Sequence, residues 1–433
     1  MDLAARRKVS FRILPFIFLA MVVAFLDRTN VGFAALTMNK ELGMTAEALG
    51  LGAGLFYVGY LILEIPGGLL AERWSATKWI ARIMFSWGAV TVLTGFIQSE
   101  WQFYLARFLL GLAEAGFIPA VVVFLGHWFP SEVRAKALSF FYMGIPFATV
   151  VGGPLASLLL EHHFLQLSGW RWLFVVEGIL AIVAGWLVLL FLRDHPEEVG
   201  WLTQQEKAML RAQLSAEQKR FGEVHSVRWS RVFTDSIPIR IGLAMFFLTP
   251  CYLGLSYFLP LIFKEISSVS NTAIGWLLAI PYFVAMICMY GVSLNSDRTG
   301  ERRWHTVSLW LLGVVGLMLL NFTSHSSTWI LMVWVTIAVV GFNSFYGAFW
   351  SLPQTYFTGL SAAAALGFIN IMGNMGGFFG PYLTGYIRES TGNYTLAISL
   401  WVISGLVSAA LILSLPKQRN VQVVVGGKQK IEG

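Results

Sequence analysis

The feature that most constrains this chain is a series of twelve apolar runs, each close to 20 residues or longer. A helix needs roughly 20 consecutive apolar residues to cross a hydrocarbon core about 30 Å thick. Because 57% of the residues are hydrophobic and only 12% are charged, a water-soluble enzyme is excluded. We predict twelve transmembrane helices, at residues 13–36, 47–71, 79–98, 102–128, 136–160, 171–192, 239–263, 272–296, 305–322, 328–356, 361–387 and 395–415.

A long polar stretch at residues 193–238 separates the first six runs from the last six. It predicts an N-terminal six-helix bundle at 1–192, a cytoplasmic linker at 193–238, and a C-terminal six-helix bundle with a cytoplasmic tail at 239–433. Two pseudo-symmetric bundles are typical of transporters that bind substrate between them at mid-membrane. The expected fold is therefore an all-α membrane protein of two pseudo-symmetric six-helix bundles.

The basic residues predict how the chain is oriented. Most of the 30 lysines and arginines fall in the linker, the tail and the loops on the same side of the membrane as these. Positive loops are retained in the cytoplasm, so we expect a multi-pass protein of the cell inner (plasma) membrane with both termini cytoplasmic. The membrane explains the net charge of +7 better than nucleic-acid binding does. Cys251 and Cys288 lie inside apolar runs and suggest neither a disulfide nor a metal site.

Charged residues deep in the predicted helices are candidates for function, because each costs about 2.5–3.5 kcal/mol at the bilayer centre. Five of them stand out, and all belong to the N-terminal half: Asp27, Arg28, Glu64, Arg107 and Glu114. We therefore expect ion coupling in the first half. The second half is expected to offer neutral polar and aromatic contacts.

Arg28 is the candidate for binding a substrate carboxylate, because a guanidinium presents a permanently charged fork to two oxygens; a structural ion pair is the alternative. Adjacent residues on a helix point about 100° apart, so Asp27 is expected to face a neighbouring helix. Arg107 and Glu114 are seven residues apart and share one face. Movement of Glu114 between a dry environment and an arginine could load and release a proton, unless the pair is purely structural.

Amides in the 361–387 helix also need partners. Asn370 and Asn374 lie four residues apart on one face, and amides facing lipid would be unsatisfied. They therefore line a cavity or a helix contact, and for Asn374 packing and binding remain equally open. Glu64, close to Pro66, is assigned to structure or gating.

Several stretches resemble a known family. The loop at 293–305, SLNSDRTGERRWH, resembles the signature loop of the major facilitator superfamily. Its residue sequence is similar to that of the anion:cation symporter family within this superfamily. Residues 68–74, GLLAERW, form a degraded copy with Glu72 where the superfamily usually has aspartate. Further resemblance lies at 26–32, 59–66, 107–116, 169–174, 201–203 and 370–381, so it covers nearly the whole chain.

The resemblance implies the major facilitator fold and roles for individual residues. Asp27 and Glu114 match the proton-carrying pair of the family, and Arg107 matches its arginine partner. Tyr60, Trp350 and Asn370 match substrate-contacting positions, which Asn374 and Arg28 would join. The two signature loops imply a gating set of Asp297, Arg298, Arg302, Glu72 and Arg73.

Together these features predict proton-coupled symport of a small organic anion by alternating access. The resemblance to this family favours a hydroxy-dicarboxylate such as tartrate, or a sugar acid, as the substrate. Symport of an aromatic carboxylate and uncoupled facilitation of an organic anion are the alternatives within transport. A membrane sensor would need an output domain, and a membrane enzyme a nucleophile with its base or a metal-ligand set. We expect a monomer in the lipid bilayer with the proton as coupling ion, and no cofactor, metal or nucleic acid.

Overall fold

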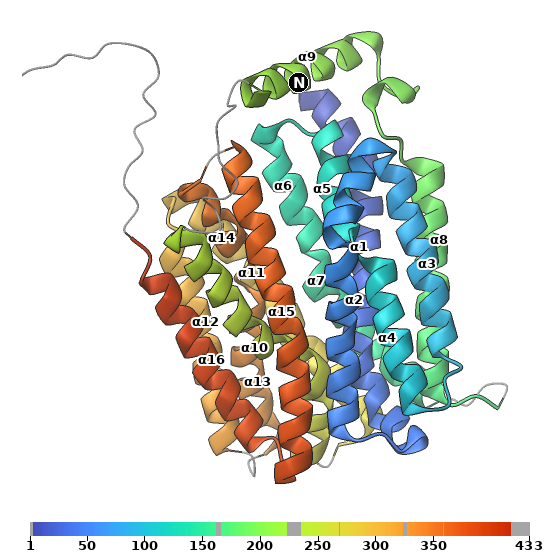
Figure 1. Ribbon diagram of the computed structural model, residues 1–433, viewed down its shortest axis with the longest axis vertical. Helices are drawn as coiled ribbons and strands as arrows, with labels where there is room; N and C mark the ends of the chain where they lie inside the picture. The colour runs from blue at the N-terminus through green and yellow to red at the C-terminus, as the bar shows by residue number, and fades with distance from the viewer. Residues whose placement is uncertain are drawn as a thin grey trace, which may run out of the picture.

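The computed structural model describes residues 3–161, 166–222, 235–267, 269–323, 327–357 and 359–416, and these residues are mostly helical (Figure 1). The first half holds α1 (Leu3–Leu42), α2 (Ala46–Arg73), α3 (Ala76–Thr94), α4 (Glu100–Glu114), α5 (Phe117–Trp128), α6 (Ser131–Tyr142), α7 (Gly144–Leu160) and α8 (Gly169–Phe191). The linker holds η1 (Pro196–Glu198) and α9 (Gln204–Gly222). The second half holds α10 (Ser236–Ile266), α11 (Asn271–Thr299), α12 (Arg303–Phe322), α13 (Thr328–Asn343), α14 (Tyr346–Ser351), η3 (Pro353–Thr355), α15 (Gly359–Thr391) and α16 (Thr395–Leu413).

All twelve predicted transmembrane positions fall on helices, so the all-α membrane fold is confirmed. Ten helical segments of the described chain are long and apolar enough to cross a membrane by length and composition. The other two positions are α3, which packs along α8, and α15, which packs between α2 and α10. The apolar runs located the helices because each side chain facing lipid must itself be apolar. The proposed domain limits of 1–192, 193–238 and 239–433 stay a prediction.

Three of the predicted helices are interrupted, which the sequence interpretation did not foresee. The run at 102–128 breaks between α4 and α5, where Gly116 takes a left-handed conformation with φ of 83° that glycine adopts without steric cost. The runs at 136–160 and 328–356 break between α6 and α7 and between α13 and α14. Hydropathy continues through each break, so an apolar pattern alone gives no sign of it. Irregular backbone at membrane depth is tolerated where protein buries it.

The two halves contact each other through α1 with α10, α2 with α15, and α7 with α11. We call the end of the molecule that carries α9 the linker end (Figure 1). Glycines permit the close approaches between halves, and these lie away from the linker end. A methyl group on Gly54 would stand 2.8 Å from the Phe378 carbonyl oxygen, and one on Gly32 would stand 2.6 Å from that of Tyr257. The molecule is therefore tightly closed at the end opposite the linker end.

Replacing Gly54 with valine is expected to destabilise this closed arrangement. The added side chain would meet the Phe378 backbone oxygen and, at 3.0 Å, the Phe378 ring, and overpacking of this kind costs about 1–3 kcal/mol. Thermal unfolding of the detergent-solubilised protein should show a lower midpoint. Gly367→Val in α15 is the matched control, because among the described residues no atom beyond its own stretch of helix lies within 4 Å of the added Cβ. Equal midpoints for the two variants would contradict this account of the interface.

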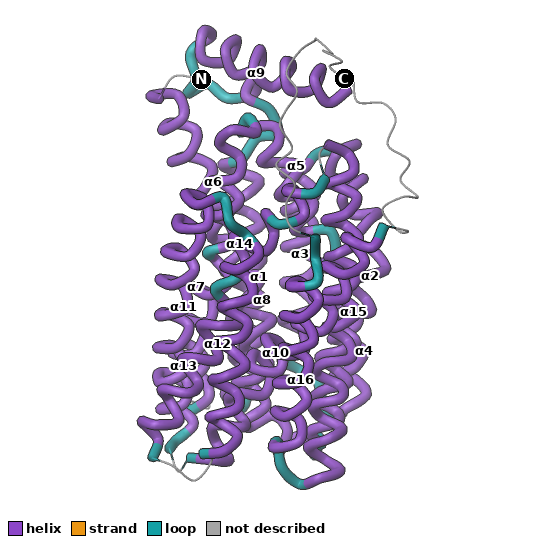
Figure 2. Tube along the Cα trace, turned by 90° about the vertical axis from the view of Figure 1, so that its left-hand side faces the viewer, coloured by secondary structure: helices purple, strands orange, loops and turns teal. Residues whose placement is uncertain are grey.

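The linker docks on the first half across the linker end (Figure 2). Lys8 of α1 donates to Glu206 of α9 at 2.7 Å, and this hydrogen bond lowers the pKa of Glu206. The Trp201 ring stacks on Trp128 with centroids 5.7 Å apart. Asp194 accepts a hydrogen bond from the Thr77 backbone N–H at 2.8 Å, close to the start of α3. These contacts tie the described linker residues to α1, α3 and α5; the predicted basic tail lies outside the described residues.

Candidate functional site

The site is built around an ion pair between Arg28 of α1 and Glu114 of α4. Arg28 donates from Nε at 2.9 Å and from Nη2 at 2.5 Å, both to Oε1 of Glu114. The Glu114 side chain is 1% exposed and that of Arg28 is 13% exposed. Glu114 is the last residue of α4, so the break before α5 lies at the ion pair. Discontinuous helices of this kind are a recurrent way to build a transporter site.

Aromatic rings surround the Arg28 guanidinium. Its central carbon lies 4.9 Å from the ring centroid of Phe25, 4.9 Å from that of Phe56 and 5.2 Å from that of Tyr60. A cation over an aromatic face is stabilised by the ring quadrupole. Tyr60 was a predicted substrate contact, and the structure places it directly at Arg28.

The second half contributes tyrosines to the same site. Tyr252 of α10 and Tyr346 of α14 lie within electrostatic range of Arg28. Tyr346 also stacks on Tyr142 of the first half, with ring centroids 6.4 Å apart. Because Tyr142 ends α6 and Tyr346 begins α14, two of the helix breaks meet here. Arg28 is thus positioned at the interface between the two halves.

Asp27 faces the neighbouring helix α3, as predicted from the 100° rotation between adjacent residues. It is 2% exposed, and its Oδ2 accepts a hydrogen bond from the Thr91 hydroxyl at 2.8 Å. Its other oxygen is buried with no hydrogen-bond partner among the described residues. Asp27 is therefore a buried carboxylate with an unused acceptor, next to the site but turned away from it.

Arg107 is the predicted partner of Asp27 and Glu114, and the structure assigns it a different contact. The Glu114 carboxylate is bonded to Arg28, while Nη2 of Arg107 donates to the Tyr257 hydroxyl at 3.4 Å. Arg107 lies within electrostatic range of both carboxylates, and its Nε and Nη1 have no hydrogen-bond partner within the described chain. The seven-residue spacing placed Arg107 and Glu114 on one face of a helix. The arginine that contacts Glu114 is nevertheless Arg28, which belongs to α1.

Glu177 of α8 is a sixth charged residue away from the ends of the predicted helices, and the sequence interpretation missed it. It is 1% exposed, and its Oε1 accepts a hydrogen bond from the Asn30 side-chain amide. Its position inside the apolar run at 171–192 is enough to identify it from the sequence as a charged residue within a membrane helix. The expectation of five intramembrane charges was therefore incomplete.

The predicted amides of the second half meet Glu64. Both Asn370 and Asn374 of α15 donate to the Glu64 carboxylate of α2, Asn374 at 3.1 Å. Glu64 is 5% exposed, and its bonds join the two halves. A substrate that contacts Asn370 must therefore share or displace this contact.

Trp350, a further predicted substrate contact, lies in α14 and is partly buried. It packs edge to face on Phe349, with centroids 5.4 Å apart. Its indole Nε1 is buried and lacks a hydrogen-bond partner in the described part of the chain. A buried indole N–H usually has an acceptor, so Trp350 retains a donor that a solute could use.

The predicted gating residues lie at the linker end, where α2 and α11 end and the two predicted signature loops begin. Asp297 pairs with Arg302 at 2.7 Å within its own loop, while Glu72 lies 3.9 Å from His127 Nε2. Arg298 and Arg73 are both exposed. Partial burial of Glu301 is outweighed by hydrogen bonds from Trp304 and His305, which lower its pKa. Among the residues that the structure describes, these contacts join neither loop to the other, so the gating role stays a prediction.

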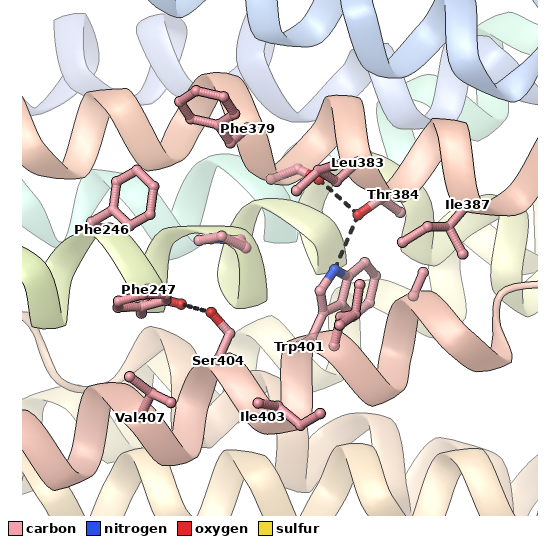
Figure 3. Close-up of a pocket in the computed structure, with 14 residues that line it drawn as sticks. Phe246, Phe247, Phe379, Leu383, Thr384, Ile387, Trp401, Ile403, Ser404 and Val407 are labelled. Atoms are coloured by element: carbon pink, nitrogen blue, oxygen red, sulfur yellow. Dashed lines mark hydrogen bonds between the residues drawn. The ribbon is translucent and has the colours of Figure 1, made fainter.

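A separate hollow of about 340 Å³ lies between α10, α15 and α16 (Figure 3). Its walls are apolar, and its polar groups are used internally: Trp401 donates to Thr384 at 3.0 Å, and Ser404 donates to the Phe247 carbonyl at 2.5 Å. An anion would find no charged partner among the residues that line it. This hollow is distinct from the Arg28 site.

Comparisons with known proteins agree with this arrangement. The family model described as Major Facilitator Superfamily matches residues 17–381 and 262–429. A protein of Agrobacterium vitis named "Putative tartrate transporter" is 40% identical over 423 residues, covering 97% of this chain and 93% of its own. A protein of Acinetobacter baumannii named "Quinolone resistance transporter" is 34% identical over 424 residues, covering 96% and 97%.

Solved structures show the same fold. The xylose transporter XylE from E. coli, in a partially occluded inward open conformation, superposes with a TM-score of 0.76 and covers 94% of this chain and 97% of its own, at 15% sequence identity. The all-helical membrane fold, the match over most of the chain and the relatives named as transporters lead to one assignment. The chain belongs to the major facilitator superfamily, and it is a multi-pass membrane transporter of a small molecule and not an enzyme.

Proposed function

We propose that this protein is a proton-coupled symporter of a small organic anion. The observation that carries the proposal is the buried ion pair between Arg28 and Glu114. It places a permanent cation and a titratable carboxylate in direct contact at the interface of the two halves. Such a pair gives one anion site for which Glu114 and a substrate carboxylate compete.

Competition for Arg28 would couple the two movements. A substrate carboxylate can accept hydrogen bonds from the Nε and Nη2 donors that Glu114 occupies only if Glu114 gives them up. Leaving Glu114 buried and charged without a partner is strongly unfavourable, so its release requires a proton. One proton thus enters with one carboxylate. Asp27, which also lies in range of Arg107, is the proposed second member of the proton-carrying pair.

The chemistry of the site favours a carboxylate that also carries hydroxyl or ring groups. The Tyr60 ring and the unused Trp350 indole N–H can contact such groups, and Asn370 and Asn374 can donate to further oxygens. The name of the Agrobacterium vitis relative supports a hydroxy-dicarboxylate such as tartrate; a sugar acid has the same groups. The aromatic cage around Arg28 supports an aromatic carboxylate as the second candidate, and the name of the Acinetobacter baumannii relative agrees with an aromatic solute.

Orientation and assembly complete the proposal. The bias of lysine and arginine toward the linker end supports a cytoplasmic linker end and cytoplasmic termini for a protein of the inner membrane. The close glycine contacts then seal the outer side, which is one of the two states that alternating access requires. The proposed working unit is a monomer, with the proton as coupling ion and no other cofactor.

Uptake into proteoliposomes tests the function. Protein reconstituted with an inward proton gradient should accumulate radiolabelled tartrate, a sugar acid or an aromatic acid above the level without a gradient, and a protonophore should abolish the excess. Transport that equilibrates but never concentrates the acid would favour the uncoupled facilitator. Empty liposomes measure passive entry of protonated acid, and absence of transport for all three acids would overturn the substrate class.

A further inference from the structure

Glu177 forms a buried polar cluster with Asn30, Asp27 and Thr91, on the side of α1 that faces α8 and α3. Asn30 joins Glu177 to α1: it follows Asp27 by three residues on that helix and donates to Glu177. Asn30 is 0% exposed, and both carboxylates are at most 2% exposed. The Arg28 site uses neither Asn30 nor Glu177.

The cluster holds more hydrogen-bond acceptors than donors. Asp27 Oδ1, Asn30 Oδ1 and Glu177 Oε2 are all buried without a hydrogen-bond partner among the described residues. The hydrogen bonds that reach the two carboxylates come from the Thr91 hydroxyl and the Asn30 amide. Buried polar atoms are rarely left unsatisfied. Protons added to the carboxylates would supply the donors that are lacking.

The charges around Glu177 also favour a protonated carboxyl group at this position. Within the described part of the chain, the elements that pack most extensively against α8 are α1, α3 and α7. From α1, Asp27 lies within electrostatic range of Glu177 and has the same charge sign. The basic residues of α3, Lys78 and Arg82, lie near its start, nine residues or more from Thr91, and α7 contains no charged residue. Asp27, by contrast, has Arg107 in range, so of the two carboxylates Glu177 has the weaker support for a negative charge.

We propose that Glu177 is a further proton-binding site, in addition to Glu114 and Asp27, and that it forms with Asp27 a two-carboxylate cluster separate from the Arg28–Glu114 ion pair. A proton adds to a Glu177 carboxylate oxygen and is given up in another stage of the cycle. Asn30 moves with α1, so its bond to Glu177 reports the position of α1 relative to α8. The inference rests on the proposed proton symport and adds one coupled proton to it.

The test is the number of protons moved per substrate in Glu177→Gln. In proteoliposomes, the substrate gradient that gives zero net flux at each imposed proton gradient yields this ratio. The variant should transport with a ratio lower by one and a flatter dependence of uptake on pH. Glu198→Gln, an exposed carboxylate of the linker, controls for loss of a negative charge and should keep the wild-type ratio. Glu177→Asp, which retains a carboxyl group, should keep the wild-type ratio.

The outcomes separate the two proposals. A wild type with no coupled proton would reject proton symport itself. A coupled wild type with the same ratio and pH profile in Glu177→Gln would overturn this inference alone and leave Glu177 as a packing residue. If Glu177→Gln fails to assemble, infrared titration of the triple variant Asp27→Asn, Glu64→Gln, Glu114→Gln should still show a titrating buried carboxyl group. Absence of that signal overturns the proposal equally.

Discussion

Replacing Arg28 with lysine is expected to reduce carboxylate binding by roughly 10- to 100-fold, because a charge-assisted hydrogen bond contributes about 1.5–3 kcal/mol. Lysine keeps the positive charge, so Glu114 remains neutralised and the protein should fold. It cannot reproduce the two donors that Arg28 directs from Nε and Nη2, since an ammonium group is a point charge and not a planar fork. The dissociation constant, measured by scintillation proximity with radiolabelled substrate, gives the result directly.

The control for Arg28→Lys is Arg82→Lys. Arg82 also lies over an aromatic ring, that of Trp79 at 4.7 Å, but it is exposed and remote from the site. Binding to this variant should match the wild type. Unchanged affinity in Arg28→Lys, with the protein correctly assembled, would show that the guanidinium serves the ion pair alone and does not hold the substrate.

Replacing Glu114 with glutamine is expected to abolish concentrative uptake while exchange of internal for external substrate continues. Glutamine leaves Arg28 without its anion, so a substrate carboxylate can bind without any proton. In the wild type, uptake should rise as the external pH falls, because protonation of Glu114 must precede release of Arg28. In the variant this rise should be lost. Counterflow in preloaded proteoliposomes measures exchange, and net uptake under a proton gradient measures accumulation.

The comparison variant for Glu114→Gln is Glu206→Gln. Glu206 also pairs with a cation, Lys8, but it lies in α9 and outside the membrane helices. That change should preserve both accumulation and exchange. If Glu114→Gln still concentrates substrate against its gradient with the wild-type pH dependence, proton coupling lies elsewhere in the molecule and the competition for Arg28 is wrong.

The break at Glu114 illustrates what the apolar pattern could not resolve. Apolar residues continue from α4 into α5, so the sequence predicted one helix at 102–128. The left-handed turn at Gly116 packs closely on a second helix: a methyl group there would lie 2.7 Å from the Cα of Gly67 on α2. This contact, between residues distant in sequence, excludes a side chain from the break beside the ion pair.

Glu64 and Glu177 show two other limits. Glu64 was assigned to structure or gating from Pro66 and helix position, whereas its partners Asn370 and Asn374 come from the other half of the chain. Glu177 was visible in its apolar run and was overlooked, and its relation to Asp27 depends on the packing of α8 against α1. The arginine partner of Glu114 likewise depended on which helices meet.

The sequence by itself determined the membrane environment, the places of the apolar membrane segments, and most of the charged residues available for function. These follow from composition along the chain, because lipid excludes unpaired polar groups wherever a helix crosses it. Tertiary structure alone decided which charges pair, where helices break and which end of the molecule is closed. Those properties depend on contacts such as Arg28 with Glu114 and Glu64 with Asn370, between residues 86 and 306 positions apart, and helical periodicity specifies only the face that a residue occupies on its own helix.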